Sequence, residues 1–354
     1  MKRIGLLKVG RGLALRPRSW SQGLSSSGRL MLVCEPKVWR RQGRGVMSAL
    51  RQAGFQAAFH LLPTGEGAKT WAAVSHLLSA MLKAGLGRDA GLVALGGGTV
   101  TDAAGFAAAI YMRGIPWVSM PTTLLGQVDG GIGGKTALDL PEGKNLAGAF
   151  HQPLAVVCDL DCLGSLPGRE RVSGLAEALK CGLALDTGLW RFMRDHWVSL
   201  LLGEPAASRR VITRCAELKL AVVARDERET SGQREILNFG HTVGHALEAA
   251  AGLGPLRHGE AVILGMRAAV RLSRRHAGLD EASAAEIEDF LAGVQVPRLE
   301  LREAKVLTAL RRDKKARRGQ RRFVLLRRVG WPVLKAVPEA SVREAVRSIL
   351  KELR

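Results

Sequence analysis

The stretch Asp89-Ala-Gly-Leu-Val-Ala-Leu-Gly-Gly-Gly-Thr-Val-Thr-Asp102 decides the fold class of this chain. Its first half is a continuous apolar run of strand length, which is typical of a buried strand. Three glycines follow, and the small residues of 103–110 then favour a packed helix. A strand, a glycine loop and a helix present backbone N–H groups and a helix N-terminus to phosphate. The stretch therefore predicts an α/β unit with a candidate phosphate-binding loop, although its glycines do not follow the GxGxxG spacing.

Strand-like and helical segments alternate around this stretch. Apolar runs of strand length occur at residues 30–35, 116–120 and 154–159, and helical spacing occurs at 46–53 and 69–84. Such alternation is typical of a mostly parallel sheet with helices packed on it. The sequence therefore predicts an α/β domain for the N-terminal half.

The character of the chain changes after Pro167. From there to the end, amphipathic helical spacing dominates, apart from a short strand expected at 321–326. A length of 354 residues leaves room for about two domains. We therefore expect an α/β domain over residues 1–163 and an all-helical domain over 164–354.

Composition places the chain among globular proteins. The apolar fraction is 47%, and no run of about 18 charge-free apolar residues predicts a membrane span. The basic N-terminus lacks the long apolar core of a signal peptide, so we expect a cytoplasmic protein. The five cysteines include no CxxC pair, which favours packed thiols over a disulfide framework.

The net charge of +21 is high, and the basic residues are densest at 311–322. Nucleic-acid binding, steering of an anionic substrate and a general arginine bias would each account for it. The chain is only 5% aromatic, and the basic run has no interleaved aromatic residues for base stacking. Nucleic-acid binding is therefore the weakest of these interpretations.

Three of the eight histidines lie within residues 236–260. His241 and His245 are four residues apart, so on a helix both imidazoles project from one face. His258 follows a glycine-rich turn and opens a second helical run. Three neutral imidazoles would suit a catalytic zinc, but half-buried histidines at packed helix ends fit the same pattern.

Several other polar residues are candidates for a functional role because of the segments in which they lie. Glu177 lies in an apolar helix, where it could bind a metal or form a salt bridge with Lys180. Asp129 lies in a glycine-dense loop, and Asn238 could orient a ligand or cap the helix of His241. Polar turn sequence further along holds Lys135, Lys144 and Asn145.

Taken in order, these motifs resemble the 3-dehydroquinate synthase family of the sedoheptulose phosphate cyclase superfamily. The resemblance rests on Pro63–Lys69, Gly96–Asp102, Tyr111–Gly114, Pro121–Leu125, Val128–Asp129, Gly133–Lys135, Gly143–Asn145, Ala176–Lys180, Asn238–His245 and His258–Glu260. It implies a Rossmann-like NAD-binding domain followed by a helical metal-binding domain.

The resemblance also implies the site residues. Zinc, for which cobalt could substitute, would be bound by Glu177, His241 and His258, while His245 would lie near the substrate phosphate instead. The residues implied for NAD are Gly97, Gly98, Asp102, Thr122, Thr123, Lys144, Glu66 and Lys69, with Glu35 and Ser165 at positions where this chain departs from the family. Those implied for substrate are Asp129, Lys135, Asn145, Lys180, Lys219, Arg234, Asn238, His245 and Lys314. Arg113 would serve the phosphate site of a neighbouring subunit, which implies a homodimer.

The implied substrate is 3-deoxy-D-arabino-heptulosonate 7-phosphate, a sugar acid with a carboxylate and a phosphate. The implied reaction gives 3-dehydroquinate and phosphate by transient NAD oxidation, phosphate elimination, re-reduction and intramolecular aldol cyclisation. NAD would therefore be catalytic, and neither nucleic acid nor membrane would be a partner. Lys135, Lys219, Arg234 and Lys314 would suit the two anionic ends.

Several departures and rival functions accompany this resemblance. Gly130 and Gly131 replace two serines, and Lys37 replaces a usual adenosine contact. A related cyclase, of the aminodehydroquinate or 2-deoxy-scyllo-inosose synthase type, would share most of these motifs. A metal- and NAD-dependent alcohol dehydrogenase would differ by releasing NADH stoichiometrically, whereas a cyclase releases phosphate without net NADH.

Overall fold

The computed structural model describes residues 5–252, 254–312 and 322–354. The chain folds into two compact units. The first comprises Met1–Leu166 and Gly203–Arg228, and the second comprises Pro167–Leu202 and Glu229–Arg354. The division at 166/167 lies close to the expected boundary at 163/164. Residues 203–228 differ from the expectation, because they group with the first unit.

The first unit contains the expected parallel sheet. Its six strands run in the order β1-β8-β5-β4-β2-β3, and every pairing between them is parallel. The strands are β1 (Leu6–Gly10), β2 (Arg29–Cys34), β3 (Gln56–Leu61), β4 (Gly91–Gly96), β5 (Trp117–Pro121) and β8 (Ala155–Asp159). β4 lies in the middle and is buried along its whole length, as its unbroken apolar run predicts.

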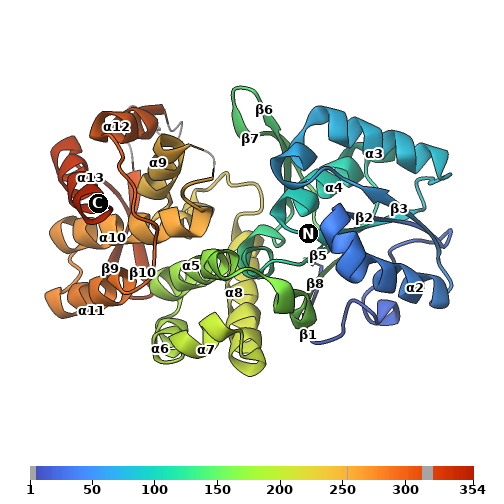
Figure 1. The fold of residues 1–354 in the computed structure, drawn as a ribbon, viewed down its shortest axis with the longest axis horizontal. Helices are drawn as coiled ribbons and strands as arrows, with labels where there is room; N and C mark the ends of the chain where they lie inside the picture. Colours follow the sequence, from blue (N-terminus) through green and yellow to red (C-terminus); the bar gives the residue numbers. More distant parts are fainter. Residues whose placement is uncertain (1–4, 253, 313–321) are drawn as a thin grey trace. The chain divides into compact units, whose positions relative to one another are not determined.

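Helices cover both faces of this sheet (Figure 1). α3 (Trp71–Lys83) and α4 (Gly98–Ile110) pack on one face, and their apolar residues form one core cluster with Met31, Val33, Leu92 and Ala94 of the sheet. α2 (Arg44–Gln52) packs on the other face with Leu30, Leu32, Val93 and Leu95. The alternation of these strand residues between the two clusters follows the period of two along a strand. α8 (Pro205–Arg225) completes the unit beside β1.

A hairpin interrupts the alternation between β5 and β8. β6 (Lys135–Leu140) and β7 (Gly143–Phe150) pair antiparallel and separately from the main sheet. Lys135, Lys144 and Asn145 therefore lie on strands and not in the polar turn that the sequence indicated. The hairpin packs against α4, the helix that follows the three-glycine loop.

The second unit is mainly helical and is built around α10 (His258–His276), which contacts helices α5, α9, α11 and α13. The helices are α5 (Gly168–Leu185), α6 (Thr187–Asp195), α7 (Trp197–Leu202), α9 (His241–Ala251), α11 (Glu281–Ala292), α12 (Glu303–Arg312) and α13 (Glu339–Glu352). The expectation of an all-helical domain needs one correction. One short strand was expected, but β9 (Arg322–Arg328) and β10 (Trp331–Ala336) form an antiparallel hairpin.

Two further expectations concern the cysteines and the membrane. All five cysteines are free and buried, as packed thiols should be. Burial raises the pKa of the Cys34 thiol to about 12, so the reactive thiolate is scarce at neutral pH. Among the described residues, no helix is long and apolar enough to cross a membrane.

Candidate active site

A buried carboxylate on α5 is the first component of the candidate metal centre. Glu177 has no solvent exposure, and Lys180 one turn later is only 2% exposed and forms an ion pair with it. The salt bridge that the sequence offered as an alternative is therefore present. It does not exclude a metal, because Lys180 pairs with Oε2 while two imidazoles lie beside Oε1.

Glycines allow the three helices that meet here to approach closely. Gly240, the residue before α9, has φ +79°, and a Cβ there would lie 2.8 Å from the backbone N of Met266 on α10. A Cβ on Gly259 of α10 would overlap the backbone of Ser173 on α5, and one on Gly265 would overlap the Gly240 carbonyl. Only glycine fits such close backbone approaches. These contacts place His241 and His258, the first residues of α9 and α10, beside Glu177.

The imidazoles converge on a single carboxylate oxygen. Nε2 of His258 lies 3.2 Å from Glu177 Oε1, and Nε2 of His241 lies 3.4 Å from the same oxygen. His245 stands one turn along α9, with its ring centroid 5.1 Å from that of His241. The metal-binding atoms of the three histidines all lie within 4.8 Å of one another. His241 is buried, whereas His245 is exposed.

Both candidate histidine ligands are oriented through their other ring nitrogen. Nδ1 of His241 lies 3.2 Å from the Phe239 carbonyl oxygen, which can only accept, so the proton is on Nδ1 and the lone pair is on Nε2. Nδ1 of His258 lies 3.2 Å from Oε2 of Glu248. Partners of this kind fix the orientation of metal-binding imidazoles.

The electrostatics of this cluster favour a bound cation. Burial alone would raise the pKa of Glu177, but Lys180 and the two histidines hold it well below its usual range. Burial lowers the pKa of His241, so its imidazole is neutral at pH 7 and ready to bind a metal. Burial opposes protonation of His258 as well, but Glu177 and Glu248 outweigh it and raise its pKa to about 10. A metal ion would supply the positive charge that the proton on His258 now provides.

The donor set fits zinc. Two ligands about 2.0–2.1 Å from a tetrahedral ion lie roughly 3.4 Å apart, which matches the two distances between Glu177 Oε1 and the imidazole nitrogens. One carboxylate and two imidazoles also leave a coordination position open, as catalytic zinc sites do. A site of three imidazoles is the alternative that the histidine spacing alone allows.

In the first unit, the candidate nucleotide residues gather at the carboxyl ends of β2, β4 and β5. Gly97 caps the N-terminus of α4, and a Cβ on Gly98 would meet nothing within 4 Å. The Thr122 N–H donates to the Gly96 carbonyl over 2.9 Å, which places Thr123 next to Gly97. Glu35 follows β2, and its Oε1 accepts hydrogen bonds from Gly65 N and Thr99 Oγ1. Open space over half-buried glycines at a helix N-terminus fits a pyrophosphate.

A buried lysine joins the β6–β7 hairpin to α4. Lys69 is 5% exposed, and its Nζ donates to Asp102 Oδ2 over 2.8 Å and also to Asn145 Oδ1. Asp139 lies 3.7 Å from the same ammonium and accepts from the Asn145 N–H over 2.8 Å. Burial raises the pKa of Asp102 although Lys69 opposes this effect. Nearby, Lys144 pairs with Glu66 at 2.8 Å.

A second lysine of the first unit is held by the glycine-dense loop. Lys219 on α8 donates to the Asp129 carbonyl over 2.6 Å and forms an ion pair with the Asp129 carboxylate. Asp129 lies in a single π-helical turn, Gly126–Gly130, and the Gly131 N–H donates to the Gly126 carbonyl over 2.8 Å. The turn is therefore hydrogen-bonded and compact at the position where the two serines are replaced.

The remaining predicted residues have varied surroundings. Arg234 is 2% exposed and Asn238 half-buried, and both belong to the 3₁₀ segment Gln233–Asn238 that leads to α9. Arg113 is exposed and has φ +66°. Ser165 ends the 3₁₀ segment after β8, where its carbonyl accepts a hydrogen bond from Arg41. Lys314 lies outside the described residues.

Sequence reasoning missed Glu248, Asp139 and the packing glycines. Glu248 follows His241 by seven residues on α9, so it shares a face with the histidines, and this spacing was a usable signal. Asp139 contacts Asn145 only because the hairpin folds back, and that pairing was not evident from the sequence. Gly240, Gly259 and Gly265 matter through contacts between helices, which a local pattern does not reveal.

Comparison with known proteins places these features in a family. Residues 59–173 match the family described as 3-dehydroquinate synthase N-terminal, and residues 174–316 match 3-dehydroquinate synthase C-terminal. A 3-dehydroquinate synthase of Bordetella pertussis is 46% identical over 90% of this chain and 89% of its own length. One from Pelobacter propionicus is 43% identical over 86% and 85%, respectively.

Solved structures agree with the fold and bear on the rival functions. ValA, a 2-epi-5-epi-valiolone synthase of Streptomyces hygroscopicus with NAD+ and Zn2+ bound, has a TM-score of 0.86 at 29% identity, over 99% of this chain and 98% of its own. A 2-deoxy-scyllo-inosose synthase with NAD+ and Co2+ has a TM-score of 0.85 at 26% identity, over 97% and 96%. A glycerol dehydrogenase of Schizosaccharomyces pombe has a TM-score of 0.70 at 16% identity, over 99% and 91%, which shows only the shared fold. The chain belongs to the 3-dehydroquinate synthase family.

Proposed function

We propose that this chain is a 3-dehydroquinate synthase that depends on NAD and on a divalent metal, zinc or cobalt. The observation that carries the proposal is the placement of two imidazole nitrogens 3.2 and 3.4 Å from one oxygen of buried Glu177. The identity of 46% to a 3-dehydroquinate synthase over 90% of the chain supports it. The substrate would be 3-deoxy-D-arabino-heptulosonate 7-phosphate, and the products would be 3-dehydroquinate and phosphate.

The metal would be held by Glu177, His241 and His258. NAD would be held by the carboxyl ends of the parallel strands, with its pyrophosphate at Gly97 and Gly98. When bound, the metal supplies a Lewis acid that favours ionisation of a substrate hydroxyl, and NAD supplies a reversible hydride acceptor. The chain's own residues must then bind the anionic ends of the substrate and carry protons.

Basic side chains would bind the carboxylate and the phosphate of the substrate. Lys219 is pre-positioned by Asp129, which removes part of the entropic cost of ordering a lysine side chain. Arg234 is held in a buried setting, where a guanidinium recognises an oxyanion with two parallel hydrogen bonds. His245 is exposed beside buried His241 and half-buried His258, so its imidazole can donate a hydrogen bond to the phosphate.

Two residues without an assigned role complete the proposal. Glu248 would orient His258 and favour its proton-free Nε2 as a ligand. Asp139 would hold Asn145 and Lys69 in place. Arg113 would extend into the phosphate site of a second copy, which makes the functional unit a homodimer. We further propose that the enzyme acts in the cytoplasm as part of the shikimate pathway.

The proposal is tested by phosphate release from the heptulosonate 7-phosphate with purified protein, zinc and NAD. Phosphate should appear with a stoichiometric carbocyclic product, should require both cofactors, and should leave no net NADH. Accumulation of NADH in proportion to substrate would indicate an alcohol dehydrogenase instead. A panel of sugar phosphates that lack the carboxylate separates the sister cyclases, because turnover of one of these in preference to the heptulosonate would refute the assigned substrate.

A further inference from the structure

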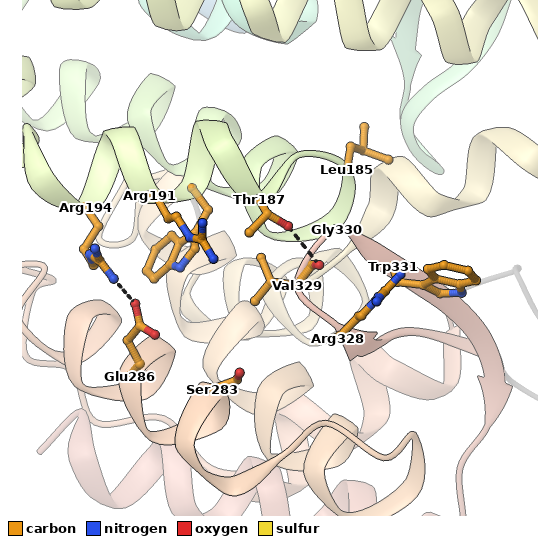
Figure 2. Close-up of a pocket in the computed structure, with 11 residues that line it drawn as sticks. Leu185, Thr187, Arg191, Arg194, Ser283, Glu286, Arg328, Val329, Gly330 and Trp331 are labelled. Carbon is orange, nitrogen blue, oxygen red and sulfur yellow. Dashed lines mark hydrogen bonds and ion pairs between the residues drawn. The ribbon is translucent and has the colours of Figure 1, made fainter.

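A cavity lies within the second unit, and none of the residues assigned above to metal, NAD or substrate lines it. Its volume is about 570 Å³. Its walls come from the end of α5, one face of α6, the first half of α11 and the turn that joins β9 to β10 (Figure 2). Pockets of this size in proteins bind small organic molecules.

The walls of this cavity are held in place by packing and hydrogen bonds. Trp190 on α6 is 2% exposed and meets the ring of Phe290 on α11 edge-on at 5.0 Å. The hairpin turn has φ +79° at Gly330, whose N–H donates to the Leu183 carbonyl over 2.8 Å. Thr187 Oγ1 donates to the Val329 carbonyl over 3.1 Å. The cavity is therefore preformed in the folded unit.

Three arginines and one carboxylate line this cavity. Arg194 is neutralised, because it pairs with Glu286 and with Asp195. Arg191 and Arg328 have no acidic partner within the described part of the chain. The Arg328 guanidinium lies 4.6 Å above the ring centroid of Trp331, which orients it without neutralising its charge. Two guanidiniums that form no ion pair in the described part of the chain, one from α6 and one from β9, therefore line the cavity (Figure 2).

We propose that this cavity binds a small organic anion that carries two anionic groups, each a phosphate or a carboxylate. Guanidinium groups recognise these oxyanions through paired N–H donors, and two guanidiniums on different elements call for two such groups. Ser283 adds a hydroxyl to the lining, and Leu185 and Trp331 add apolar surface for a carbon skeleton. The site is separate from the metal centre, so it does not depend on the proposed cyclase activity.

The experiment measures binding of 3-phosphoglycerate, which has one phosphate and one carboxylate, to the full chain loaded with zinc and NAD. Calorimetry at constant ionic strength should detect a binding event that the Arg191→Gln/Arg328→Gln double variant weakens at least tenfold. Arg298→Gln is the matched control, because Arg298 lies in the same unit and does not line the cavity. Equal weakening by this control would show general charge attraction and would overturn the proposal.

Two further variants test whether the binding event takes place in the cavity. Ser283→Phe fills the space but keeps both arginines, so it should abolish the same binding event. Arg234→Gln, at a candidate substrate residue, should leave the event intact; loss of binding only in this variant would place the ligand at the substrate site. Circular dichroism and thermal unfolding verify that each variant is folded, and unaltered binding in folded Ser283→Phe would contradict the assignment.

The requirement for two anionic groups in the ligand is tested with probes that carry only one of them. Glycerol 3-phosphate has only the phosphate, and glycerate has only the carboxylate. Each should bind at least tenfold more weakly than 3-phosphoglycerate, and the tighter of the two identifies the group that contributes more. A probe with only one of these groups that binds as tightly as 3-phosphoglycerate would refute the two-group requirement.

Discussion

At the scale of single residues, Glu248 would affect the proposed metal centre through His258. Its carboxylate lies 3.2 Å from Nδ1 of that imidazole and shares the histidine face of α9. Outer carboxylates of this kind typically change metal affinity about 10–100-fold. Glu248→Gln should therefore weaken zinc binding by about this factor, measured by competition with a chelator, while the fold is retained. Unchanged zinc affinity would show that His258 is not a ligand or needs no orientation.

Asp139 is the corresponding residue of the first unit. It accepts the Asn145 N–H over 2.8 Å while Asn145 has φ +57°, and it faces the buried Lys69 ammonium. A hydrogen bond to a charged group is worth about 1.5–3 kcal/mol. Asp139→Ala should therefore raise the Kd for NAD about tenfold, measured by fluorescence titration, because Lys69 loses part of its support.

The control for Asp139 is Asp195, an exposed carboxylate of the second unit that pairs with Arg194. Asp195→Ala should leave the Kd for NAD unchanged. If both variants changed NAD binding equally, the effect would come from net charge and not from the Lys69 contact.

At the scale of elements, the turn Gly126–Gly130 tests the replacement of two serines by glycine. A Cβ on Gly131 would lie 2.9 Å from the Gly126 carbonyl oxygen and 3.0 Å from Pro121 Cβ. On Gly130 the nearest atom would be the Leu125 carbonyl oxygen at 3.9 Å. Gly131→Ser should therefore reduce the free energy of unfolding by about 1–3 kcal/mol through overpacking. Gly130→Ser should change it by less than about 0.5 kcal/mol.

Chemical denaturation of the two serine variants measures this difference directly. Equal stability of both variants would show that the turn relaxes to accept a side chain at Gly131. In that case the close packing of the turn would not explain why glycine stands there.

The helices that carry the candidate metal ligands illustrate what local patterns can and cannot predict. Helical spacing placed His241 and His245 on one helix, and the glycine-rich turn placed the start of the next helix at His258. Their placement beside Glu177 did not, because it depends on α5 and α10 touching at Ser173 and Gly259. Gly259→Ala should therefore cost about 1–3 kcal/mol of unfolding free energy and reduce zinc binding together. Loss of stability with full zinc affinity would show that the close approach is structural only.

At the scale of the whole molecule, the parallel sheet was the most predictable feature. A strand such as β4, buried on both faces, has an apolar run that does not depend on distant partners for its recognition. The return of residues 203–228 to the first unit was not predicted, because α8 has ordinary helical spacing and its place beside β1 is a long-range contact. The β6–β7 hairpin was not predicted, and only one strand of the β9–β10 hairpin was expected. Both hairpins are defined by the pairing of their strands and not by composition.

The candidate metal site was also only partly predictable from local sequence patterns. The resemblance assigned Glu177, His241 and His258 to one metal, and the structure places two nitrogens near one carboxylate oxygen. The histidine spacing alone suggested three imidazoles, and His245 does lie near the other two. Spacing shows which side chains share a face, whereas the choice of ligands also depends on an acid about sixty residues earlier in the chain.

Zinc content is the measurement that tests the metal assignment most directly. The His258→Ala variant lacks an imidazole on α10, and the His245→Ala variant lacks one on α9. Both purified variants are equilibrated with the same zinc concentration and then desalted. We predict that His258→Ala loses both zinc and phosphate-releasing activity, while His245→Ala keeps about one zinc per chain and loses activity alone. Full zinc occupancy in folded His258→Ala, or loss of zinc in His245→Ala, would contradict the assignment of Glu177, His241 and His258 as the metal ligands.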